Sequence, residues 1–387
     1  MTDTSKRDDI RKAISEIDRD LVDAISRRAD LVEEILKEKV KSGLPVRDRE
    51  REQAILKSAL ERAESQGVPP DLVEQLFHSL FESSVQRQRM NFDSLRDEDL
   101  NEVNVAYLGG PGSYSHIAAQ KVFARQNASV VPSPKRDFLS IFRSVENGEV
   151  EYGVVPIENT TTGAISEVYD LLLAGRTEIA GEFMLKVDHC LIGKPGGQGR
   201  INRVYGHPQV LAQSRRYLAA HPEIETHMVS SSTRALERLL EEDDTAGAMA
   251  GADAAKLFGF DVLVHDVGDH VQNFTRFIVI AQKAKRPTRA VECKTSMMFV
   301  TRDDPGALID ALMGFRDNGI NLVKLESRPI AGNPWEEMFI MDVDGHIDDD
   351  KVRDAMDTLQ NHTRQIKMLG CYVSHQIDKV RVEGGVS

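Results

Sequence analysis

The sequence predicts a multidomain protein of the α and α/β classes, in which an all-helical region precedes an α/β region and a small ferredoxin-like βαββαβ domain. Apolar residues recur at helical spacing over about the first 90 residues, strand patterns then alternate with helix patterns, and about the last 80 residues follow the βαββαβ order. A chain of 387 residues is too long for one ordinary core. We therefore place three domains at residues 1–92, 103–284 and 295–377.

Composition and charge narrow the classes of function. Hydrophobic residues at 41% and charged residues at 29% are typical of a soluble globular protein. The formal net charge of −13 argues against a nucleic-acid partner, because phosphate binding needs a basic surface, although a local cationic pocket can still bind a small anion. The three cysteines lack CxxC spacing, which predicts reduced thiols. Residues 1–9 form no apolar signal region and no apolar run reaches the length of a membrane helix, so we expect a cytoplasmic protein.

The first region is expected to form three helices. The first ends at Gly43 and Pro45, the second runs over residues 49–63, and the third begins with Asp71 as its N-cap. A first helix of this length would project beyond so small a core, so we expect a partner chain to cover it. Its apolar stripe consists of Ile10, Ile14, Ile17, Leu21, Ile25, Val32 and Ile35.

The second region alternates strands with polar loops. The strand at 103–108 is followed by the glycine-rich turn 109–113 and a helix, and the strand at 152–157 ends in the polar loop 158–163. A loop at Asn273 runs into the last strand of the region. Open α/β sheets bind their ligands in the loops at strand ends, so we expect a site there.

The third region follows a short linker at residues 283–287. Its expected elements are a strand at 296–302, a helix at 305–318, strands at 320–329 and 336–344, a helix at 349–364 and a strand at 366–373.

Cationic side chains of the first region can converge on a small dianion. Arg28 and Lys39 are eleven residues apart, so they share a helix face with Cα atoms about 16 Å apart. Arg11 lies roughly 100° away from that face, so if it joins the same pocket it comes from a neighbouring subunit. From spacing alone, a solvated charged helix is the simpler interpretation. Two polar pairs at i,i+4 spacing accompany the cations: Asp48 with Glu52, and Ser84 with Gln88.

The run from Arg11 through residues 45–48 to Gln88 resembles the all-helical chorismate mutases. A pericyclic rearrangement transfers no proton, so it is catalysed by holding a reactive conformer and stabilising charge on the ether oxygen. Because the amide of Gln88 donates at any pH, we expect a mutase activity that does not require acid. The resemblance implies carboxylate contacts from Arg11, Arg28 and Ser84 with help from Arg51, ether-oxygen contacts from Lys39 and Gln88, and hydroxyl contacts from Asp48 and Glu52.

Residues 103–282 resemble the prephenate dehydratases, whose two-lobed α/β fold is similar to that of periplasmic solute-binding proteins. The resemblance lies in segments 107–109, 112–116, 155–160, 188–191, 207–209 and 275–277. It implies that Thr275 donates a hydrogen bond to the hydroxyl that leaves as prephenate loses carbon dioxide and becomes aromatic. Phe277 is expected to form an apolar wall that desolvates the departing carboxylate. The other residues implied at the substrate are Asn159, Ser113 and Gln213, which position it, and Glu158, Thr160 and Arg276, which lie close by.

Two positions depart from the dehydratase pattern. Gly206 lacks the hydroxyl that relatives can carry before His-Pro-Gln, and Ser230 stands where some relatives have an acidic residue. Both departures leave the detailed pocket less defined without changing the expected reaction class.

No metal and no cofactor is expected. His116, His189 and His207 match no zinc spacing, and we interpret them as hydrogen-bonded structural residues. Pro111 interrupts the glycines around Gly109, so there is no GxGxxG motif for a nicotinamide cofactor. This argues against a prephenate dehydrogenase.

The third region contains the segments 304–308, which joins its first strand to a helix, and 326–329, which ends its second strand. These two motifs resemble those of ACT regulatory domains, which pair across subunits and bind an amino acid at the interface. The resemblance implies L-phenylalanine as the effector and a homodimer, or a tetramer, as the assembly. Trp335 follows the second motif, and structural packing explains it as well as ligand contact does. The implied effector-binding residues are Gly306, Ala307 and Leu308 in the first motif and Glu326, Ser327, Arg328 and Pro329 in the second.

Two other functions remain open from the sequence. One is a dehydratase whose helical region serves only to dimerise, which the full set of polar residues in that region disfavours. The other is a non-catalytic amino-acid-binding protein, which the segment Thr275-Arg276-Phe277 disfavours.

Overall fold

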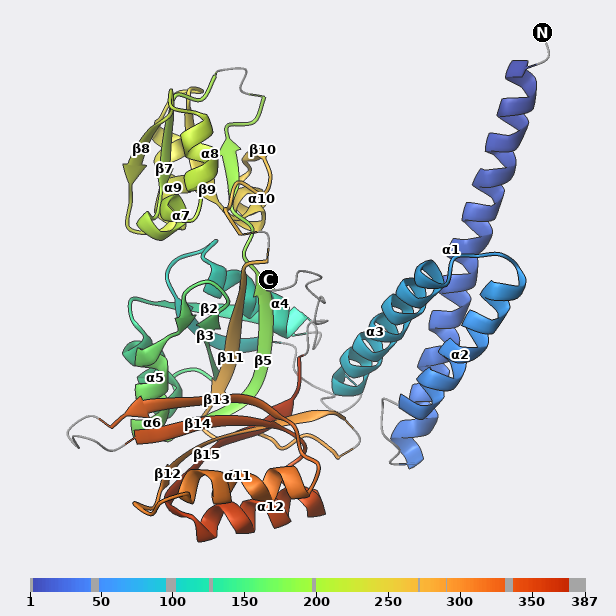
Figure 1. Cartoon of the computed structure of the whole chain (residues 1–387). Helices are drawn as coiled ribbons and strands as arrows, with labels where there is room; N and C mark the ends of the chain where they lie inside the picture. The colour runs from blue at the N-terminus through green and yellow to red at the C-terminus, as the bar shows by residue number, and fades with distance from the viewer. Residues whose placement is uncertain are drawn as a thin grey trace. The chain divides into compact units, whose positions relative to one another are not determined.

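The computed structural model describes residues 3–42, 49–94, 102–124, 128–196, 200–270, 272–289, 291–330 and 337–375 (Figure 1). They divide into two compact units, one of residues 1–99 with 288–292 and one of residues 100–287 with 293–387. Within these described ranges, no helix has the length and apolarity needed to cross a membrane.

The helical unit consists of α1 (Asp3–Ser42), α2 (Arg49–Ser65) and α3 (Pro70–Ser94), as predicted. The N-terminal part of α1 projects beyond the other two helices (Figure 1), and its apolar stripe is exposed there, with Ile10 at 52% and Ile17 at 66%. The prediction of Asp71 as N-cap was wrong by two residues, because α3 already begins at Pro70. Proline is accommodated in a first turn, where its missing N–H has no intrahelical partner.

The first lobe of the second unit is a mixed sheet with strand order β2-β1-β3-β11-β5, and β4 is paired to β3. Strands β1, β2 and β3 run parallel, whereas β11 is antiparallel to both of its neighbours, β3 and β5. The strands are β1 (Glu102–Leu108), β2 (Ser129–Lys135), β3 (Tyr152–Asn159), β4 (Gly163–Ala164), β5 (Glu178–Lys186) and β11 (Phe274–Ala281). The helices are α4 (Tyr114–Ala124), α5 (Phe138–Glu146) and α6 (Ser166–Ala174).

The second lobe is inserted between β5 and β11, so the chain passes from the first lobe to the second and returns. This double crossing gives the expected two-lobed arrangement, and Tyr107 and Phe277 of the first lobe share one core with Tyr205 and Leu236 of the second. The strands, in the order β10-β6-β9-β7-β8, are β6 (Cys190–Gly193), β7 (Arg203–Gly206), β8 (Glu225–Met228), β9 (Ala246–Ala250) and β10 (Asp261–Val264). The helices are α7 (Pro208–Ala212), α8 (Arg215–Ala220), α9 (Ser232–Glu241) and α10 (Ala252–Phe258).

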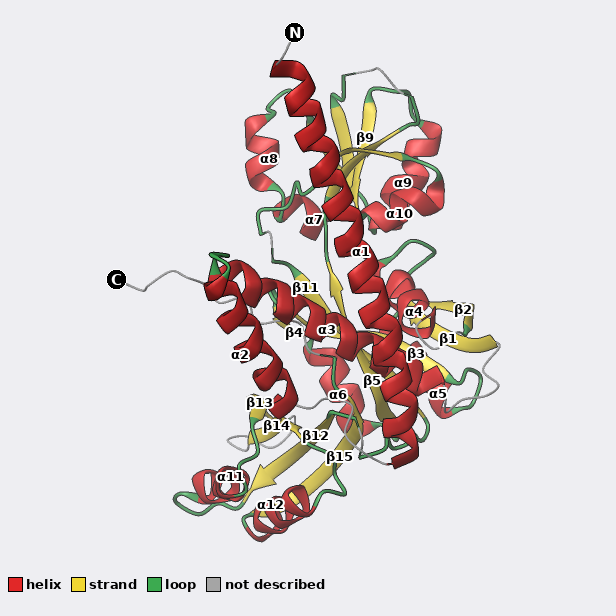
Figure 2. Ribbon diagram, turned by 90° about the vertical axis from the view of Figure 1, so that its right-hand side faces the viewer, coloured by secondary structure: helices red, strands yellow, loops and turns green. Residues whose placement is uncertain are grey.

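The C-terminal domain has the predicted βαββαβ order, with its four strands arranged as β13-β14-β12-β15 (Figure 2). Side chains of β12 (Cys293–Thr301) alternate between the two faces of this sheet. Met297 and Phe299 pack with the helices α11 (Ala307–Asp317) and α12 (Asp350–Asn361), whereas Met298 and Val300 pack against the first lobe. The first strand begins three residues earlier than predicted, at Cys293. The elements are β12 (Cys293–Thr301), α11 (Ala307–Asp317), β13 (Leu322–Pro329), β14 (Glu337–Asp344), α12 (Asp350–Asn361) and β15 (Thr363–Val373).

Candidate functional site

A cation of α1 is held against α3 in the helical unit. Arg28 Nη1 donates to Ser84 Oγ at 2.5 Å and lies 3.4 Å from the carbonyl oxygen of Leu80. The guanidinium also lies over the ring of Phe81, 5.8 Å from its centroid. The structure therefore brings together Arg28 and Ser84, two of the residues predicted at the first site.

The other predicted residues of this site are not joined to that pair by the described structure. Arg11 is exposed on the same unbroken helix, 17 residues and about 25 Å along the axis from Arg28. Arg51 is exposed and Glu52 half-buried on α2. Asp48 and the side chains of Lys39 and Gln88 lie outside the described residues, so their predicted roles stay predictions.

The second site is built where β3 and β11 pair and the two lobes meet. Asn159 ends β3 directly opposite Thr275. Its Nδ2 group donates to Thr275 Oγ1 at 2.9 Å, to Asn273 Oδ1 at 2.8 Å and to the carbonyl oxygen of Phe274 at 3.1 Å. The buried Thr275 hydroxyl thus accepts a hydrogen bond, and within the described residues its own hydrogen has no protein acceptor. It is available to donate to a bound molecule.

The orientation of the Asn159 amide is fixed by the loop that follows it. Its Oδ1 atom accepts from the backbone N–H groups of Thr161 and Thr162 at 2.9 and 3.1 Å and from Thr161 Oγ1 at 2.5 Å. This is an Asx-type turn, in which the side chain replaces a backbone acceptor. Because the loop donates its hydrogen bonds to Oδ1, the other end of the amide, Nδ2, faces Thr275.

A residue of the second lobe closes this cluster. Gln213 caps the C-terminus of α7 and donates through Nε2 to Thr161 Oγ1 of the first lobe at 3.0 Å. Its Oε1 atom lies 2.8 Å from His189 Nε2 and 3.4 Å from Asn273 Nδ2. Gln213 therefore ties the 158–163 loop to the segment that leads into the second lobe.

His189 is held as a neutral imidazole. The amide oxygen of Gln213 only accepts, so His189 Nε2 carries a hydrogen; Nδ1 lies 3.1 Å from the Tyr114 hydroxyl, which donates to the carbonyl oxygen of Asp188 at 3.2 Å. Burial lowers the pKa of His189, which favours the neutral form of the imidazole. The interpretation of His116, His189 and His207 as hydrogen-bonded residues is confirmed, since Nδ1 of His116 and of His207 each accept a backbone N–H.

The remaining predicted side chains of this site are tied to the protein. Ser113 Oγ donates to the carbonyl oxygen of Leu108 at 3.0 Å and accepts the N–H of His116 at 3.2 Å, at the start of α4. Thr160 Oγ1 donates to the carbonyl oxygen of Gln272. Phe277 is buried in the shared core of the lobes. The structure does not bond any of these three to the Asn159–Thr275 pair.

Arg276 points to the opposite side of the sheet from Thr275. Its buried guanidinium donates to Glu182 at 2.8 Å, to Asp342 at 2.6 Å and to the Tyr372 hydroxyl at 2.8 Å. Burial opposes ionisation of Asp342, but Arg276, the Ser296 hydroxyl and Lys294 together outweigh burial and lower the pKa of that carboxyl. The structure therefore joins Arg276 to the C-terminal domain, not to Thr275 and Asn159.

Three more predicted residues lie in this contact between domains. Lys324 of β13 bonds Glu158 at 3.0 Å and Glu326 at 2.9 Å. Arg328 Nη1 donates to the carbonyl oxygen of Ser166 at 2.9 Å. Glu158, predicted at the substrate, and Glu326 and Arg328, predicted at the effector, thus lie on the face shared by the first lobe and the C-terminal domain.

The other face of β13 is more open. Ser327 and Pro329 are exposed, and so are the apolar side chains of Val323 and Leu325 on the same alternation. Gly306 precedes α11 with a φ of 89°, a left-handed conformation that favours glycine, and Ala307 and Leu308 follow in the first turn. Trp335 lies outside the described residues.

Comparison with known proteins matches three successive parts of the chain. Family models match as chorismate mutase type II at residues 10–89, prephenate dehydratase at 105–285 and ACT domain at 295–360. The chain is similar to the bifunctional chorismate mutase/prephenate dehydratase of Escherichia coli (strain K12), with 36% identity over 375 residues, 95% of this chain and 96% of that relative.

Two solved structures resemble the second unit. One is prephenate dehydratase in complex with L-Phe from Arthrobacter aurescens, with 29% identity and a TM-score of 0.61 over 70% of this chain and 90% of that one. The other is described as a novel type of quorum quenching acylase, with 30% identity and a TM-score of 0.62 over 70% of this chain and 98% of that one. Arg28, Thr275 and Gly306 each fall within a matched family model.

Proposed function

The chain belongs to the family of bifunctional chorismate mutase/prephenate dehydratases, and on this premise we propose that its helical unit rearranges chorismate to prephenate while its two-lobed domain converts prephenate to phenylpyruvate. It is thus an isomerase and a lyase of L-phenylalanine synthesis. The observation that carries the second activity is the hydrogen bond from Asn159 to Thr275, because it leaves the threonine hydroxyl as a donor.

In the dehydratase step, Thr275 donates a hydrogen bond to the hydroxyl of prephenate. The bond to the ring carboxylate breaks, carbon dioxide leaves, and its electron pair forms the new double bond of the ring as the C–O bond breaks. The departing oxygen gains negative charge, and a preorganised donor stabilises charge that develops in the transition state. Ser113 and Gln213 position the substrate together with Asn159, and Thr160 and Phe277 complete the pocket.

In the mutase step, Arg28 binds a substrate carboxylate with Ser84 beside it. Arg11 binds the other carboxylate and comes from a second copy of the chain, since about 25 Å of helix separates it from Arg28 of its own chain. Arg51 assists. The roles at the ether oxygen belong to Lys39 and Gln88, and those at the hydroxyl to Asp48 and Glu52.

A homodimer places Arg11 in this way and covers exposed apolar surface. Ile10, Ile14 and Ile17 on the projecting part of α1 are each more than half exposed. Val323 and Leu325 leave a second apolar strip on β13. Burying such surface is favourable by roughly 25 cal/mol per Å². We place the dimer in the cytoplasm, where thiols such as those of the three buried cysteines stay reduced.

L-Phenylalanine inhibits by binding at the C-terminal domain, at Gly306, Ala307 and Leu308 and at the end of β13. The ion pairs of Lys324 with Glu158 and of Arg276 with Asp342 give this domain a direct connection to the strands that carry Asn159 and Thr275. An effector shifts an equilibrium only by binding two states differently, and these strands are the elements that the two states would displace.

A time course with chorismate tests the function. The purified full chain is incubated with chorismate while prephenate and phenylpyruvate are followed, with and without L-phenylalanine. We expect prephenate to rise transiently, phenylpyruvate to follow, and phenylalanine to suppress the second product. Accumulation of prephenate alone would overturn the dehydratase assignment. Unchanged chorismate, with conversion of added prephenate, would leave the helical unit with a dimerising role only.

A further inference from the structure

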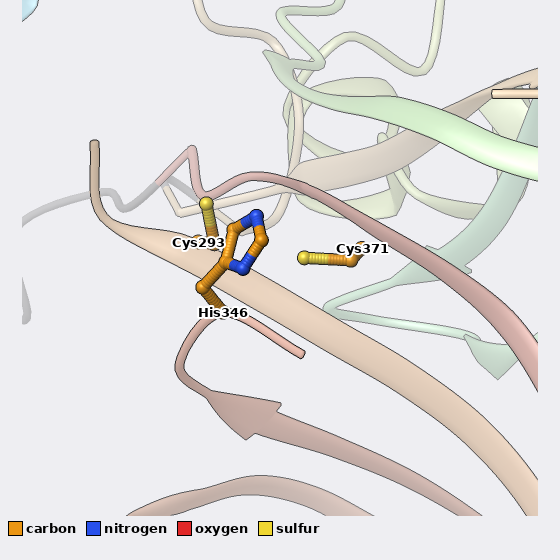
Figure 3. Close-up of side chains that lie close together, drawn as sticks. All are labelled: Cys293, His346 and Cys371. Atoms are coloured by element: carbon orange, nitrogen blue, oxygen red, sulfur yellow. The ribbon is translucent and has the colours of Figure 1, made fainter. Parts of the chain in front are cut away.

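Two cysteines and a histidine meet at one end of the C-terminal sheet. Cys293 begins β12, His346 follows β14, and Cys371 lies near the end of β15 (Figure 3). They meet because β12 lies between β14 and β15, and the ends of the three strands coincide. None of the three residues belongs to either catalytic site or to the effector motifs.

The cluster has the size and composition of a metal site. The three side chains are buried, and the two Sγ atoms and one imidazole nitrogen all lie within 4.8 Å of one another. In a tetrahedral Zn²⁺ site the bonds are about 2.3 Å to sulfur and 2.0 Å to nitrogen, so the ligand atoms lie roughly 3.5 Å from one another. The three side chains would therefore have to move together by about 1 Å to bind one ion. We propose that Cys293, His346 and Cys371 bind a thiophilic transition-metal ion, with Zn²⁺ as the commonest ion for such donors.

A disulfide is the main alternative use of the two cysteines, and the strand register disfavours it. Cys293 pairs with Val373 and Thr295 pairs with Cys371, so the cysteines are diagonal neighbours on one face. Diagonal Cα atoms in antiparallel sheets lie about 7–8 Å apart, beyond the usual limit of about 7 Å for a disulfide. A metal ion can span this separation, because two metal–sulfur bonds of about 2.3 Å each then join the sulfur atoms in place of one shorter S–S bond.

The surroundings favour the ligand form of His346. His346 Nε2 donates to the carbonyl oxygen of Pro287 at 3.0 Å, the contact that orients metal-binding histidines. The lone pair is then on Nδ1, which accepts the N–H of Asp348 at 3.1 Å, and the ion would replace that interaction.

The position of the cluster gives the ion a defined mechanical effect. The residue after each cysteine, Lys294 and Tyr372, belongs to the polar network around Arg276 on the opposite face. An ion that joins Cys293 to Cys371 would therefore hold together the two strands that support this network. The bound ion would stabilise the folded second unit, because any ligand that binds only the folded state does so.

Cobalt titration of the intact protein tests the site. The full chain is treated with a chelator, kept reduced with a phosphine and titrated with Co²⁺, whose thiolate complexes show a strong charge-transfer absorption; Zn²⁺ is then added as competitor. We expect one equivalent of Co²⁺ to bind with this absorption, Zn²⁺ to displace it, and Zn²⁺ to raise the unfolding temperature. Cys371→Ser and Cys293→Ser should lose all three effects.

Cys190→Ser provides the matched control, because Cys190 is the remaining buried cysteine and lies in the second lobe. It should bind Co²⁺ as the unchanged chain does. Conversion of added prephenate in metal-free buffer shows that each variant is folded. Absence of the charge-transfer absorption in the unchanged chain would overturn the proposal, and so would its loss in Cys190→Ser with retention in Cys371→Ser. This test measures the absorption of bound Co²⁺ and not enzyme turnover, so a negative result would overturn the metal site without affecting the catalytic assignments.

Discussion

The Asn159 side-chain amide donates to the Thr275 hydroxyl at 2.9 Å across the paired strands β3 and β11. The next pair in the same register, Glu158 and Arg276, faces the C-terminal domain instead, where each side chain is bonded to a residue of that domain. Period-two alternation thus gives two adjacent strands one face that carries the Asn159–Thr275 pair and one face that contacts the C-terminal domain. The two faces are one residue apart, so a small displacement of either strand is felt on both.

Thr275→Ala should abolish most dehydratase activity while sparing the mutase. Loss of one preorganised donor to a developing oxyanion typically lowers turnover about 10²- to 10³-fold. Thr275→Ser keeps the hydroxyl and should retain much more activity. Both variants are assayed with prephenate for dehydration and with chorismate for rearrangement. Unchanged phenylpyruvate formation by the alanine variant would contradict the role of Thr275.

Asn159→Asp should also impair dehydration, although the change is nearly isosteric. A carboxylate only accepts, so the Thr275 hydroxyl would donate to it and no longer to the substrate. The carboxylate would also face Asn273 Oδ1, an acceptor 2.8 Å from the present amide nitrogen. We expect at least about a tenfold loss of kcat, since each 1.4 kcal/mol of lost transition-state stabilisation is tenfold. Asn147→Asp, an exposed change at the end of α5, is the control and should leave kcat unchanged.

Arg276→Leu should destabilise the second unit strongly. The change removes the cation that pairs with Asp342 at 2.6 Å in a buried site, and breaking a buried ion pair in this way costs about 3–5 kcal/mol. Arg200→Leu removes an exposed cation, 81% accessible, from Glu223 and should cost less than about 1 kcal/mol. Urea unfolding followed by far-UV circular dichroism measures both. Equal midpoints for the two variants would refute the buried network as a stabilising element.

The fold and the residue types of the site were predictable from the sequence, whereas the pairing and direction of side chains were not. The segments 155–160 and 275–277 identified Asn159 and Thr275, but only the register of β3 with β11 places one opposite the other. The segment 275–277 also suggested Arg276 near the substrate, yet its side chain lies on the other face of the sheet. A motif identifies neighbours in sequence, and in a strand such neighbours point in opposite directions.

The cluster of Cys293, His346 and Cys371 gave no local signal at all. Its residues are far apart in sequence, and the spacing rules that detect metal sites depend on ligands from one turn or hairpin. The strand order β14-β12-β15 brings the three residues together. The predicted first strand began at residue 296, three residues after the true start of β12 at Cys293, so the prediction did not place Cys293 in the sheet.

Stability of the second unit should fall as the pH falls below about 6.5. Burial lowers the pKa of His189 and of His116 in the folded state, whereas an unfolded histidine titrates near 6.5. Below that value the unfolded state binds more protons, so the free energy of unfolding decreases with decreasing pH; above it, this contribution is constant. Urea unfolding at several values between about pH 5 and about pH 8 measures the slope. His189→Gln should reduce it, and exposed His270→Gln should not.

Arg11 and Arg28 should complement each other across the subunits. If each mutase site takes Arg28 from one chain and Arg11 from another, Arg11→Ala and Arg28→Ala homodimers have no intact site. A heterodimer of the two has one site that lacks both cations and one that lacks neither. Random mixing makes about half of all dimers heterodimers, each with one intact site of two, so the mixture should recover about a quarter of the mutase activity of the unsubstituted protein.

The helix geometry makes this outcome specific. α1 is continuous over its 40 residues, so no bend within the described helix can bring Arg11 back to Arg28 of the same chain. The two variants are mixed, unfolded and refolded together, and rearrangement of chorismate is compared with that of each variant refolded alone. A mixture of Arg28→Ala and Ser84→Ala is the control. Those two residues touch within one chain, so each mutase site of their heterodimer still lacks one of them and no activity should be recovered. No recovery in the first mixture would show that Arg11 does not serve the partner's site.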